Sequence, residues 1–379
     1  MELVNEIVEA RNFWEAWMSV RRNKGASGID NMSVDVLDVY MPLHMDEIKQ
    51  SICRKQYKPS PVRRVFIPKP NGKQRPLGIP TVVDRVVQQA TAQVLNRLYE
   101  PLFSEHSYGF RPNRSCHQAI NQALDYLNAG YEWVVDFDIE KYFDTVNHDK
   151  LISILREQVN DSATLHLIRS FLKSGVMEGG FVSATTEGVP QGGCISPILS
   201  NIYLDKLDKE LESRELRFVR YADDFDIFVK SERSADRVMA SVSRWLESKL
   251  RLKVSATKTK VVRPTKSVFL GFTFWKSTRG WECRPTDAAK EKLETKVKQV
   301  LVRKRATAQP MSYIFTKLNQ VIRGWVNYYH IGSMATYLRD VFGPWLRHKV
   351  RVVIVKQWKK CGTIHKNLLK IKSIIKSRI

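Results

Sequence analysis

Three aspartates stand at the ends of apolar runs, and their type and spacing suit them to binding metal ions. Asp138 closes the β-rich run Trp133 to Asp138, and Asp223 and Asp224 lie side by side between the two apolar runs of residues 218–229. A hairpin turn tolerates aspartate easily, so an isolated Asp-Asp pair could do no more than make a turn. The second acidic strand end, far upstream in the chain, favours a functional interpretation.

If the two strand ends lie side by side, the three carboxylates converge into a negative pocket that is costly unless hard cations neutralise it. Two Mg²⁺ ions about 3.5–4 Å apart are the usual device for in-line phosphoryl transfer, one activating the attacking oxygen and the other stabilising the leaving pyrophosphate. We therefore predict a site for two Mg²⁺ ions, in which Mn²⁺ can substitute, with Asp138, Ile139, Asp223 and Asp224 as ligands. The three aspartates are also the predicted catalytic residues.

The charge of the chain predicts a polyanionic partner. Lys and Arg outnumber Asp and Glu by 62 to 39, and the formal net charge of +23 attracts nucleic acid. Residues 341–379 hold eleven Lys or Arg and no Asp or Glu, a bias too strong for an ordinary solvated helix face. Charge alone fits an RNA-binding protein without chemistry as well as it fits an enzyme, so the motifs must decide between them.

The cysteines and the hydropathy indicate a cellular compartment. The acidic start of the chain lacks the basic segment of a secretory signal, and no apolar run approaches bilayer length. The cysteines form no CxxC pair and no Cys/His group at zinc spacing, which predicts a reducing environment and no structural zinc. They are Cys53, Cys116, Cys194, Cys283 and Cys361. We therefore predict a soluble, cytoplasmic protein with no membrane partner.

Apolar periodicity predicts helices and strands in mixed order. Helices are expected at residues 1–22, 81–99, 115–129, 148–173 and 196–211, and strands at residues 63–67, 133–138 and 217–230. Residues 70–73 are expected to make a basic hairpin turn. Two apolar stripes at helical spacing predict a separate helical domain after Pro285; they are Leu293, Val297 and Val300, and Ile314, Leu318, Val321 and Trp325. Without regular βαβ alternation, the expected fold class is α+β.

Several blocks together resemble a known family. The segment Tyr221 to Asp224 resembles the YxDD box of reverse transcriptases, and the segment Asp138 to Asp144 resembles their first catalytic motif. Further blocks follow in the order of that family, at Ile67 to Pro80, Ser107 to Pro112, Gly188 to Pro197 and Phe269 to Phe272. The ordered series, over residues 23–345, makes the chain similar to the group II intron-encoded reverse transcriptases and maturases of bacterial type.

The resemblance implies a right-hand polymerase with an antiparallel-sheet palm, fingers and a helical thumb. The expected divisions are an N-terminal extension (1–30), fingers and palm (31–265), primer grip and thumb, also called domain X (266–345), and a basic tail (346–379). The stretch Arg323 to Tyr329 resembles the family's thumb. The implied activity is RNA-directed DNA polymerisation, in which Mg²⁺-dependent addition of dNTPs extends a DNA primer on an RNA template. Group II intron RNA, whose splicing the protein would assist, is a further implied partner.

The resemblance also implies roles for residues around the nucleotide. Lys69 and Arg75, on the fingers, would contact the triphosphate, a role suited to cations at a hairpin tip; a solvated basic turn is the plainer alternative. Gln191 would line the nucleotide pocket, in a turn whose glycines permit close backbone approach. Phe143 would stack under the deoxyribose and exclude a 2′-hydroxyl, or serve as a core residue, or both.

Other residues near the aspartates carry weaker interpretations. Lys258 or Lys260 is placed to protonate the pyrophosphate as a general acid, and we favour Lys258, although surface charge is the competing interpretation. Asp136 shares the strand face of Asp138 by alternation. The motif register nevertheless favours Asp138 as the ligand, and Asp144 is interpreted as structural.

Two segments outside the palm also resemble parts of the family. The loop Asn23 to Asp30 resembles the N-terminal extension that covers the template, in which Gly25 and Gly28 would supply mobility and neighbouring basic residues would contact phosphates. A disordered linker is an equal alternative. The segment Phe269 to Phe272 resembles the primer grip, although an apolar strand with one glycine is more often plain core.

Three biological hypotheses stay open. The chain is a polymerase working within an intron ribonucleoprotein, or primarily an RNA-binding maturase, or a domesticated reverse transcriptase serving phage defence, spacer acquisition or DNA repair. No Cys/His cluster follows residue 345, so a zinc-containing HNH endonuclease domain is not expected. The basic tail would be a remnant DNA-binding region. The sequence predicts no oligomeric state.

Overall fold

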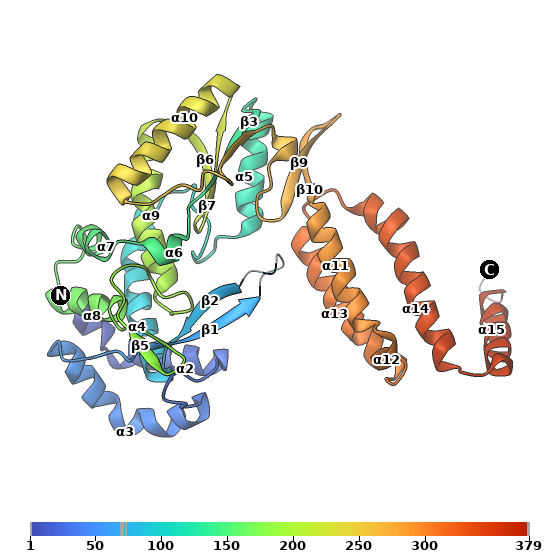
Figure 1. Cartoon of the computed structure of the whole chain (residues 1–379), viewed down its shortest axis with the longest axis horizontal. Coiled ribbons are helices and arrows are strands. Elements are labelled where there is room, and N and C mark those ends of the chain that lie inside the picture. The colour runs from blue at the N-terminus through green and yellow to red at the C-terminus, as the bar shows by residue number, and fades with distance from the viewer. Residues whose placement is uncertain (1, 69–71, 73, 377–379) are drawn as a thin grey trace. The chain divides into compact units, whose positions relative to one another are not determined.

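The chain forms two compact units, Met1–Val262 and Arg263–Ile379 (Figure 1). The computed structural model describes residues 2–68, 72 and 74–376, with side chains described as far as residue 370. The predicted division between palm and thumb, after residue 265, lies close to the division between the units. The finer divisions into extension, fingers and tail stay predictions.

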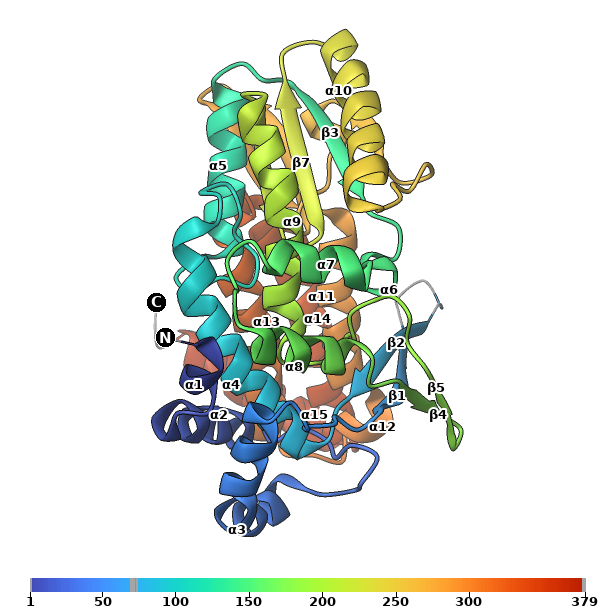
Figure 2. The ribbon, with the colours of Figure 1, turned by 90° about the vertical axis from the view of Figure 1, so that its left-hand side faces the viewer.

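A four-stranded antiparallel sheet in the first unit carries the aspartates that the sequence singled out. Its order is β6-β7-β3-β8, and its strands are β6 (Arg217–Tyr221), β7 (Asp224–Val229), β3 (Trp133–Asp138) and β8 (Lys260–Val262). The strands are rich in Val, Ile and Phe, which suit a pleated surface buried on both faces. The helices α5 (Cys116–Asn128) and α9 (Ser196–Ser213) pack on one face, and α10 (Glu232–Trp245) covers the other (Figure 2).

A second sheet, of order β2-β1-β4-β5, lies in the same unit. The strands β1 (Val62–Pro68) and β2 (Gln74–Ile79) form an antiparallel pair whose register runs from Arg63 opposite Ile79 to Pro68 opposite Gln74. The strand β4 (Val176–Glu178) joins β1 in parallel and pairs antiparallel with β5 (Phe181–Ser183). This sheet carries Arg75, the residue predicted to contact a triphosphate.

Helices and the β6-β7-β3-β8 sheet form one apolar core in this unit. The buried helix α4 (Val82–Tyr99) begins at Thr81, whose hydroxyl accepts a hydrogen bond of 3.1 Å from Asp84 N and so caps the helix. The N-terminal helices pack on α4; they are α1 (Leu3–Ile7), α2 (Ala10–Asn23) and α3 (Val34–Cys53). The remaining helices of this unit are the 3₁₀ turn Glu100–Leu102, α6 (Tyr142–Thr145), α7 (His148–Leu155), α8 (Ser162–Leu172) and the π segment Leu246–Leu250.

The second unit is a hairpin followed by helices. Its hairpin pairs β9 (Phe272–Ser277) with β10 (Gly280–Pro285), after a short 3₁₀ turn at Pro264–Lys266. The helices are α11 (Asp287–Val300), α12 (Arg303–Ala306), α13 (Met311–Tyr329), the π segment Tyr337–Phe342, α14 (Gly343–Gln357) and α15 (Cys361–Lys376). Leu293 and Val297 of α11 pack with Ile314 and Leu318 of α13 in one apolar cluster, because each stripe recurs at helical spacing.

The observed elements bear out most of the expected ones and correct three. The helix expected at residues 1–22 is two helices, α1 and α2. The long helix expected at residues 148–173 is two helices, because Asp161 caps α8; its carboxylate accepts hydrogen bonds from Ala163 N (2.9 Å) and Val4 N (2.8 Å). The helix α3 was missed. Mainly antiparallel sheets packed against helices confirm the α+β class. In the part of the chain that the structure describes, no helix is long and apolar enough to cross a bilayer.

Candidate active site

The register of the first sheet brings the predicted aspartates to one strand end. β3 pairs with β7 so that Asp138 lies opposite Asp224, and Asp136 lies opposite Asp226. Between β6 and β7 the chain reverses in a tight turn at Ala222 and Asp223, and Tyr221 lies opposite Asp224. The three aspartates therefore stand at two adjacent strand ends, which is the condition on which the predicted site depends.

The turn that carries Asp223 is supported from beneath by a buried arginine that the sequence did not reveal. Arg220 is fully buried and donates to Asp208 from Nε (2.7 Å) and Nη2 (2.5 Å). Its Nη1 donates to Ala222 O at 2.8 Å and to Asn201 Oδ1 at 3.1 Å. A planar guanidinium with its donors satisfied in this way is rigid, so it fixes the carbonyl next to Asp223.

A glycine from the Ser107 to Pro112 block packs against the same turn. A Cβ atom on Gly109 would lie 2.9 Å from Tyr221 C and 3.0 Å from Ala222 Cα, with Ala222 N nearer still. Asn201 Nδ2 donates to Gly109 O at 2.9 Å, so the arginine network also holds this glycine. Ala222 itself has a φ of 61°, a left-handed conformation that is uncommon for alanine. The turn is therefore held in place by close backbone contacts.

Burial and mutual repulsion change the acidity of the aspartates. Burial, followed by the negative charges of Asp136, Asp223 and Asp138, raises the pKa of Asp224 to about 7, while Lys258 opposes this shift. Burial also raises the pKa of Asp223, and Arg75 and Arg220 counteract it. Burial and the neighbouring carboxyl groups therefore make the charged forms of Asp223 and Asp224 costly.

Two lysines of one segment pair with the two aspartates of β3. Lys258 Nζ lies 2.8 Å from Asp138 Oδ2 and 3.0 Å from Oδ1. Lys260 Nζ lies 3.3 Å from Asp136 Oδ2, on the strand β8 that pairs with β3. The structure therefore separates the two lysines: Lys258 contacts the predicted metal ligand, and Lys260 contacts the aspartate that the motif register set aside.

The donor set fits a hard divalent cation. Carboxylate oxygens are the ligands that Mg²⁺ and Mn²⁺ prefer, and a bound cation would stabilise the ionised form of Asp224, whose pKa burial and the nearby aspartates raise. Within residues 2–68, 72 and 74–376, no three His, Cys, Asp or Glu side chains are grouped closely enough to form a ready-made metal site. Asp138, turned onto Lys258, would have to join Asp223 and Asp224. Ile139 follows Asp138 and forms an isolated bridge with Val254.

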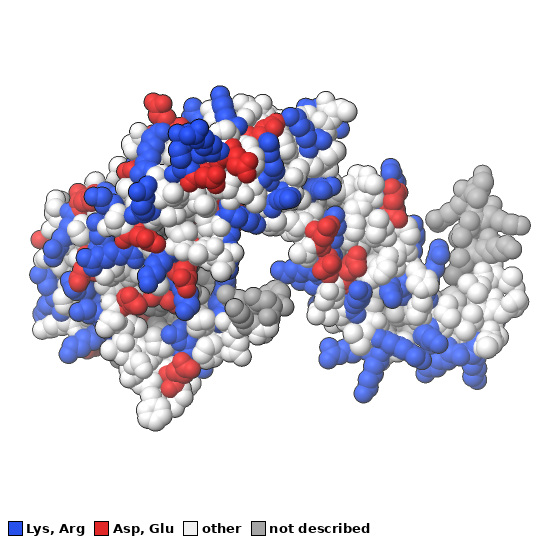
Figure 3. All heavy atoms as spheres, turned by 45° about the horizontal axis from the view of Figure 1, so that its top comes forward, with Lys and Arg blue, Asp and Glu red and all other residues white. Residues whose placement is uncertain are grey.

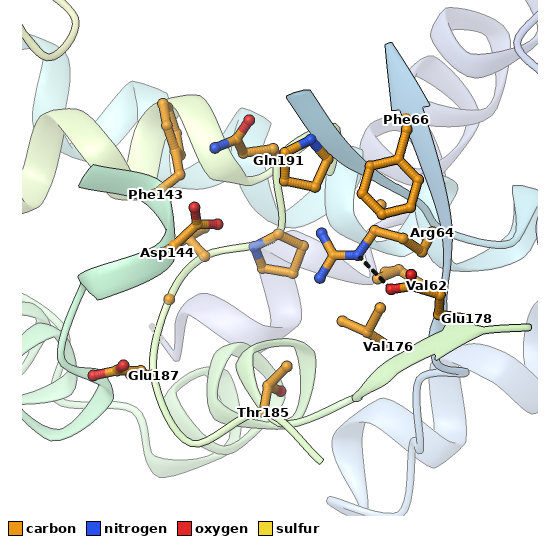
Figure 4. Close-up of a pocket in the computed structure, with 15 residues that line it drawn as sticks. Val62, Arg64, Phe66, Phe143, Asp144, Val176, Glu178, Thr185, Glu187 and Gln191 are labelled. Atoms are coloured by element: carbon orange, nitrogen blue, oxygen red, sulfur yellow. Dashed lines mark ion pairs between the residues drawn. The ribbon is translucent and has the colours of Figure 1, made fainter. Parts of the chain in front are cut away.

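Two of the residues predicted to bind the nucleotide line a cavity of about 420 Å³ in the first unit. Phe143 and Gln191 line one side, and Arg64 and Phe66 of β1 line the other (Figure 4). Backbone hydrogen bonds connect the segments that form this cavity. Val189 N donates to Phe143 O (2.7 Å), and Gly78 N donates to Gln191 O (2.7 Å).

Glycines make these backbone contacts feasible. Gly192 has a φ of 109°, and a Cβ there would lie 2.7 Å from Gly78 O. The cavity also contains Asp144 on its wall and the ion pair of Arg64 with Glu178, neither of which the sequence assigned to a pocket. Thus the Pro-Gln-Gly-Gly turn and the first catalytic motif form one surface.

The fingers residues fall partly outside the described chain. Arg75 is exposed on β2, opposite Ile67, and its charge lowers the pKa of Asp223, so the two lie within electrostatic reach. Lys69 lies outside the described residues, as does most of the predicted hairpin turn at 70–73.

The Asn23 to Asp30 loop is packed against the body of the first unit. A Cβ on Gly28 would lie 2.6 Å from Thr81 Cα, and one on Gly25 would meet the guanidinium of Arg85. Arg85 also donates to Ala26 O. In this loop the glycines permit close approach to α4, which corrects the interpretation that they supply mobility.

The Phe269 to Phe272 segment forms a tight turn within the second unit. Leu270 (φ 51°) and Gly271 (φ 80°) are left-handed, and Phe269 and Phe272 exchange backbone hydrogen bonds of 3.0 and 2.9 Å. Tyr328 of α13 donates to Leu270 O at 2.9 Å. The segment is therefore a turn anchored to the α13 helix rather than the interior of a strand.

Comparison with known proteins identifies the family. The model of the reverse transcriptase (RNA-dependent DNA polymerase) family matches residues 67–274, and that of the group II intron maturase-specific domain matches residues 290–371. Protein YkfC of Escherichia coli strain K12 is 34% identical over 66% of this chain and 76% of its own length. Group II intron-encoded protein LtrA of Lactococcus lactis subsp. cremoris is 28% identical over 94% of this chain and 74% of its own length.

Among solved structures, a partial Cas6-RT-Cas1–Cas2 complex matches 66% of this chain and 43% of its own, with 21% identity and a TM-score of 0.41. The family models cover the two units in turn, and the first one spans every acidic residue of the site. The chain therefore belongs to the reverse transcriptase family, as a group II intron-type RNA-directed DNA polymerase with a maturase domain.

Proposed function

We propose that this chain extends the 3′ end of a DNA primer with dNTPs on an RNA template, using two Mg²⁺ ions for which Mn²⁺ can substitute. The observation that carries the proposal is the β3–β7 register, which sets Asp138 opposite Asp224, beside Asp223 at the tip of the hairpin. When bound there, the cations would activate the primer 3′-oxygen and stabilise the leaving pyrophosphate. Asp138, Asp223 and Asp224 are the proposed ligands, with Ile139 beside them.

The chain's own side chains have separate proposed tasks around the nucleotide. Arg75, with Lys69, binds the triphosphate by charge-assisted hydrogen bonds. Phe143 stacks under the deoxyribose and excludes a 2′-hydroxyl, and Gln191, which lines the same cavity as Phe143, lines the nucleotide pocket. Lys258, 66% exposed at its side chain, is a cation whose long stem allows it to reach a leaving group and donate a proton.

We also propose that the second unit binds group II intron RNA and assists its splicing. Arg303, Lys304 and Arg305 form α12, and the end of α14 approaches them because Gln357 Nε2 donates to Ala306 O (3.0 Å) and Gln309 O (2.8 Å). The chain after Gln357 adds Lys359 and Lys360. Figure 3 shows Lys and Arg side chains gathered along one end of this unit. We call residues 303–305 and 356–360 the basic tip; such a surface suits an RNA backbone.

Primer extension tests the polymerase proposal. The wild type and the Asp223→Ala, Asp224→Ala double variant would be compared on poly(rA)/oligo(dT) with Mg²⁺ at matched salt. Template-dependent dTTP incorporation by the wild type and its loss in the double variant are expected. No incorporation by a folded wild type that still binds RNA would contradict the polymerase proposal and favour a purely maturase role.

Splicing of a cognate group II intron separates the two functions. The double variant leaves the basic tip unchanged, so we expect it to support splicing while losing polymerisation. Alanine substitution of residues 303–305 is expected to give the opposite pattern, with polymerisation on the homopolymer retained. Equal loss of both activities in both variants, with folding intact, would contradict the division of labour.

A further inference from the structure

Lys258 binds the carboxylate that the proposed function assigns to a metal ion. Its ammonium contacts both oxygens of Asp138, at 2.8 and 3.0 Å. A divalent cation would use the lone pairs of the same oxygens. The ammonium of Lys258 and a divalent cation therefore compete for Asp138. The carboxylate can pair with Lys258 or bind the metal ion, but not both at once.

The backbone keeps Lys258 at this position whether or not its side chain touches Asp138. Asp138 N donates to Thr259 Oγ1 at 3.1 Å, and Ser255 N donates to Asp138 O at 2.9 Å. Thr259 N in turn donates to Ser255 O at 2.9 Å. The turn from Ser255 to Thr259 is thus attached to both peptide groups of Asp138, while only the flexible stem of Lys258 has to move.

The ion pair is exposed enough to be exchanged. The side chains of Lys258 and Asp138 are 66% and 35% exposed, and ion pairs with this access to water contribute little to stability. Arg220 cannot take the same role, because both oxygens of Asp208 and two further acceptors hold it in the core. Lys258 can therefore leave Asp138 at little cost in stability.

We propose that Lys258 is an internal counter-ion of Asp138 that an incoming divalent cation displaces, so that Lys258 sets how tightly the site takes up its metal. The inference rests on the proposed function, because it takes Asp138 as a metal ligand. Exchange has two consequences. Before a metal ion binds, the ammonium of Lys258 offsets part of the repulsion among the carboxylates. With a metal ion on Asp138, the ammonium would be free to act as the proposed proton donor.

Lys260, on the neighbouring strand of the same sheet, offers a matched control for the substitution of Lys258. It pairs with Asp136 at 3.3 Å, and Asp136 lies two residues before Asp138 on β3, about 7 Å farther from the strand end. Both substitutions remove one lysine charge and one ion pair with an aspartate of β3. Only the Lys258 substitution vacates a proposed metal ligand.

The test measures metal binding rather than activity. Mn²⁺ would be titrated into the chelator-treated full-length chain without nucleic acid, at fixed pH and ionic strength, and free Mn²⁺ read by electron paramagnetic resonance. We expect Lys258→Met to lower the Mn²⁺ Kd about five- to tenfold and Lys260→Met to change the Kd less than about twofold. Lys258→Arg should leave the Kd equal or raise it, because arginine keeps the charge and binds a carboxylate with two donors. The rise in Tm on adding Mn²⁺ is expected to be largest for Lys258→Met.

The outcomes separate this inference from the proposed function. If Mn²⁺ binding disappears in the Asp223→Ala, Asp224→Ala variant but Lys258→Met binds like the wild type, displacement is wrong and the metal site stands. If Lys260→Met tightens binding as much as Lys258→Met, the effect is general electrostatics and the inference is also wrong. If the wild type shows no saturable binding that depends on Asp223 and Asp224, the inference and the proposed metal site both fail.

Discussion

Substituting Gly109 by alanine should damage polymerisation without touching a carboxylate. The added Cβ would lie 2.9 Å from Tyr221 C, about half an ångström inside an ordinary contact of 3.4 Å, and closer still to Ala222 N. These atoms are backbone, so a side-chain rotation cannot relieve the clash. The turn that carries Asp223 and Asp224 must then shift by roughly 1 Å, a displacement that can cost a factor of about 100 in rate when it misplaces catalytic groups.

The strain also has a cost in stability, of about 1–3 kcal/mol as for other overpacked interiors. Single-nucleotide incorporation would give kcat and KM for dTTP, and urea unfolding would give the free energy. We expect kcat to fall about 100-fold, with a small change in KM, because the cavity around Phe143 and Gln191 is not strained. Gly324→Ala is the control, since a Cβ there meets no atom within 4 Å. A Gly109→Ala protein with native kcat would refute this account of how the turn is held.

Three further predictions concern the pocket, a buried acid and the basic tip. Phe143→Ala should raise incorporation of ribonucleotides relative to dNTPs, and unchanged discrimination in a competition assay would rule out its role at the sugar. Burial and the charge of Asp208 raise the pKa of Asp205 to about 6. Between about pH 4 and 6 the folded state therefore keeps a proton that the unfolded state loses, and the free energy of unfolding falls as pH rises. Asp205→Asn should therefore stabilise the protein above pH 6 by up to about 3 kcal/mol and by little near pH 4, as urea midpoints across this window would show. Alanine at residues 303–305 should lower the steepness with which the logarithm of the RNA-binding constant falls with the logarithm of salt concentration, by about 2 to 3. Alanine at three exposed arginines of α10 (residues 233, 237 and 244) should not change this slope. Equal slopes in the two variants would show that the basic tip does not contact RNA.

Element types were predictable where a local pattern recurs. Apolar residues recur at helical spacing in α11 and α13, and they form short continuous runs in β3 and β7. The structure confirms the two predicted helices and the two predicted strands. The single helix expected at 148–173 was wrong because Asp161 caps a second helix by accepting from Ala163 N. Its carboxylate also accepts from Val4 N, which is distant in the chain. The helix α3 was overlooked, although Ser33 caps it with a hydrogen bond to Val36 N.

The candidate site was predictable in its carboxylates and less so in their surroundings. Acids at a strand end and at a hairpin tip are visible in a sequence because burying them needs an explanation. Gly25 and Gly28 show the limit of that reasoning. A glycine that permits motion and one that permits close packing look alike in sequence, and only the nearness of Thr81 and Arg85 decides between them.

The sequence by itself determined the chemistry of this protein: which residues carry the negative charge, which turns tolerate glycine, and that the chain as a whole attracts nucleic acid. Those properties belong to residue types and to patterns a few residues long. The tertiary structure alone decided that Lys258 meets Asp138 while Lys260 meets Asp136, and that Arg220 and Gly109 hold the catalytic turn. Such pairings depend on strand register and on packing between distant segments, and a shift of one residue would exchange the faces of the sheet and every partner with them.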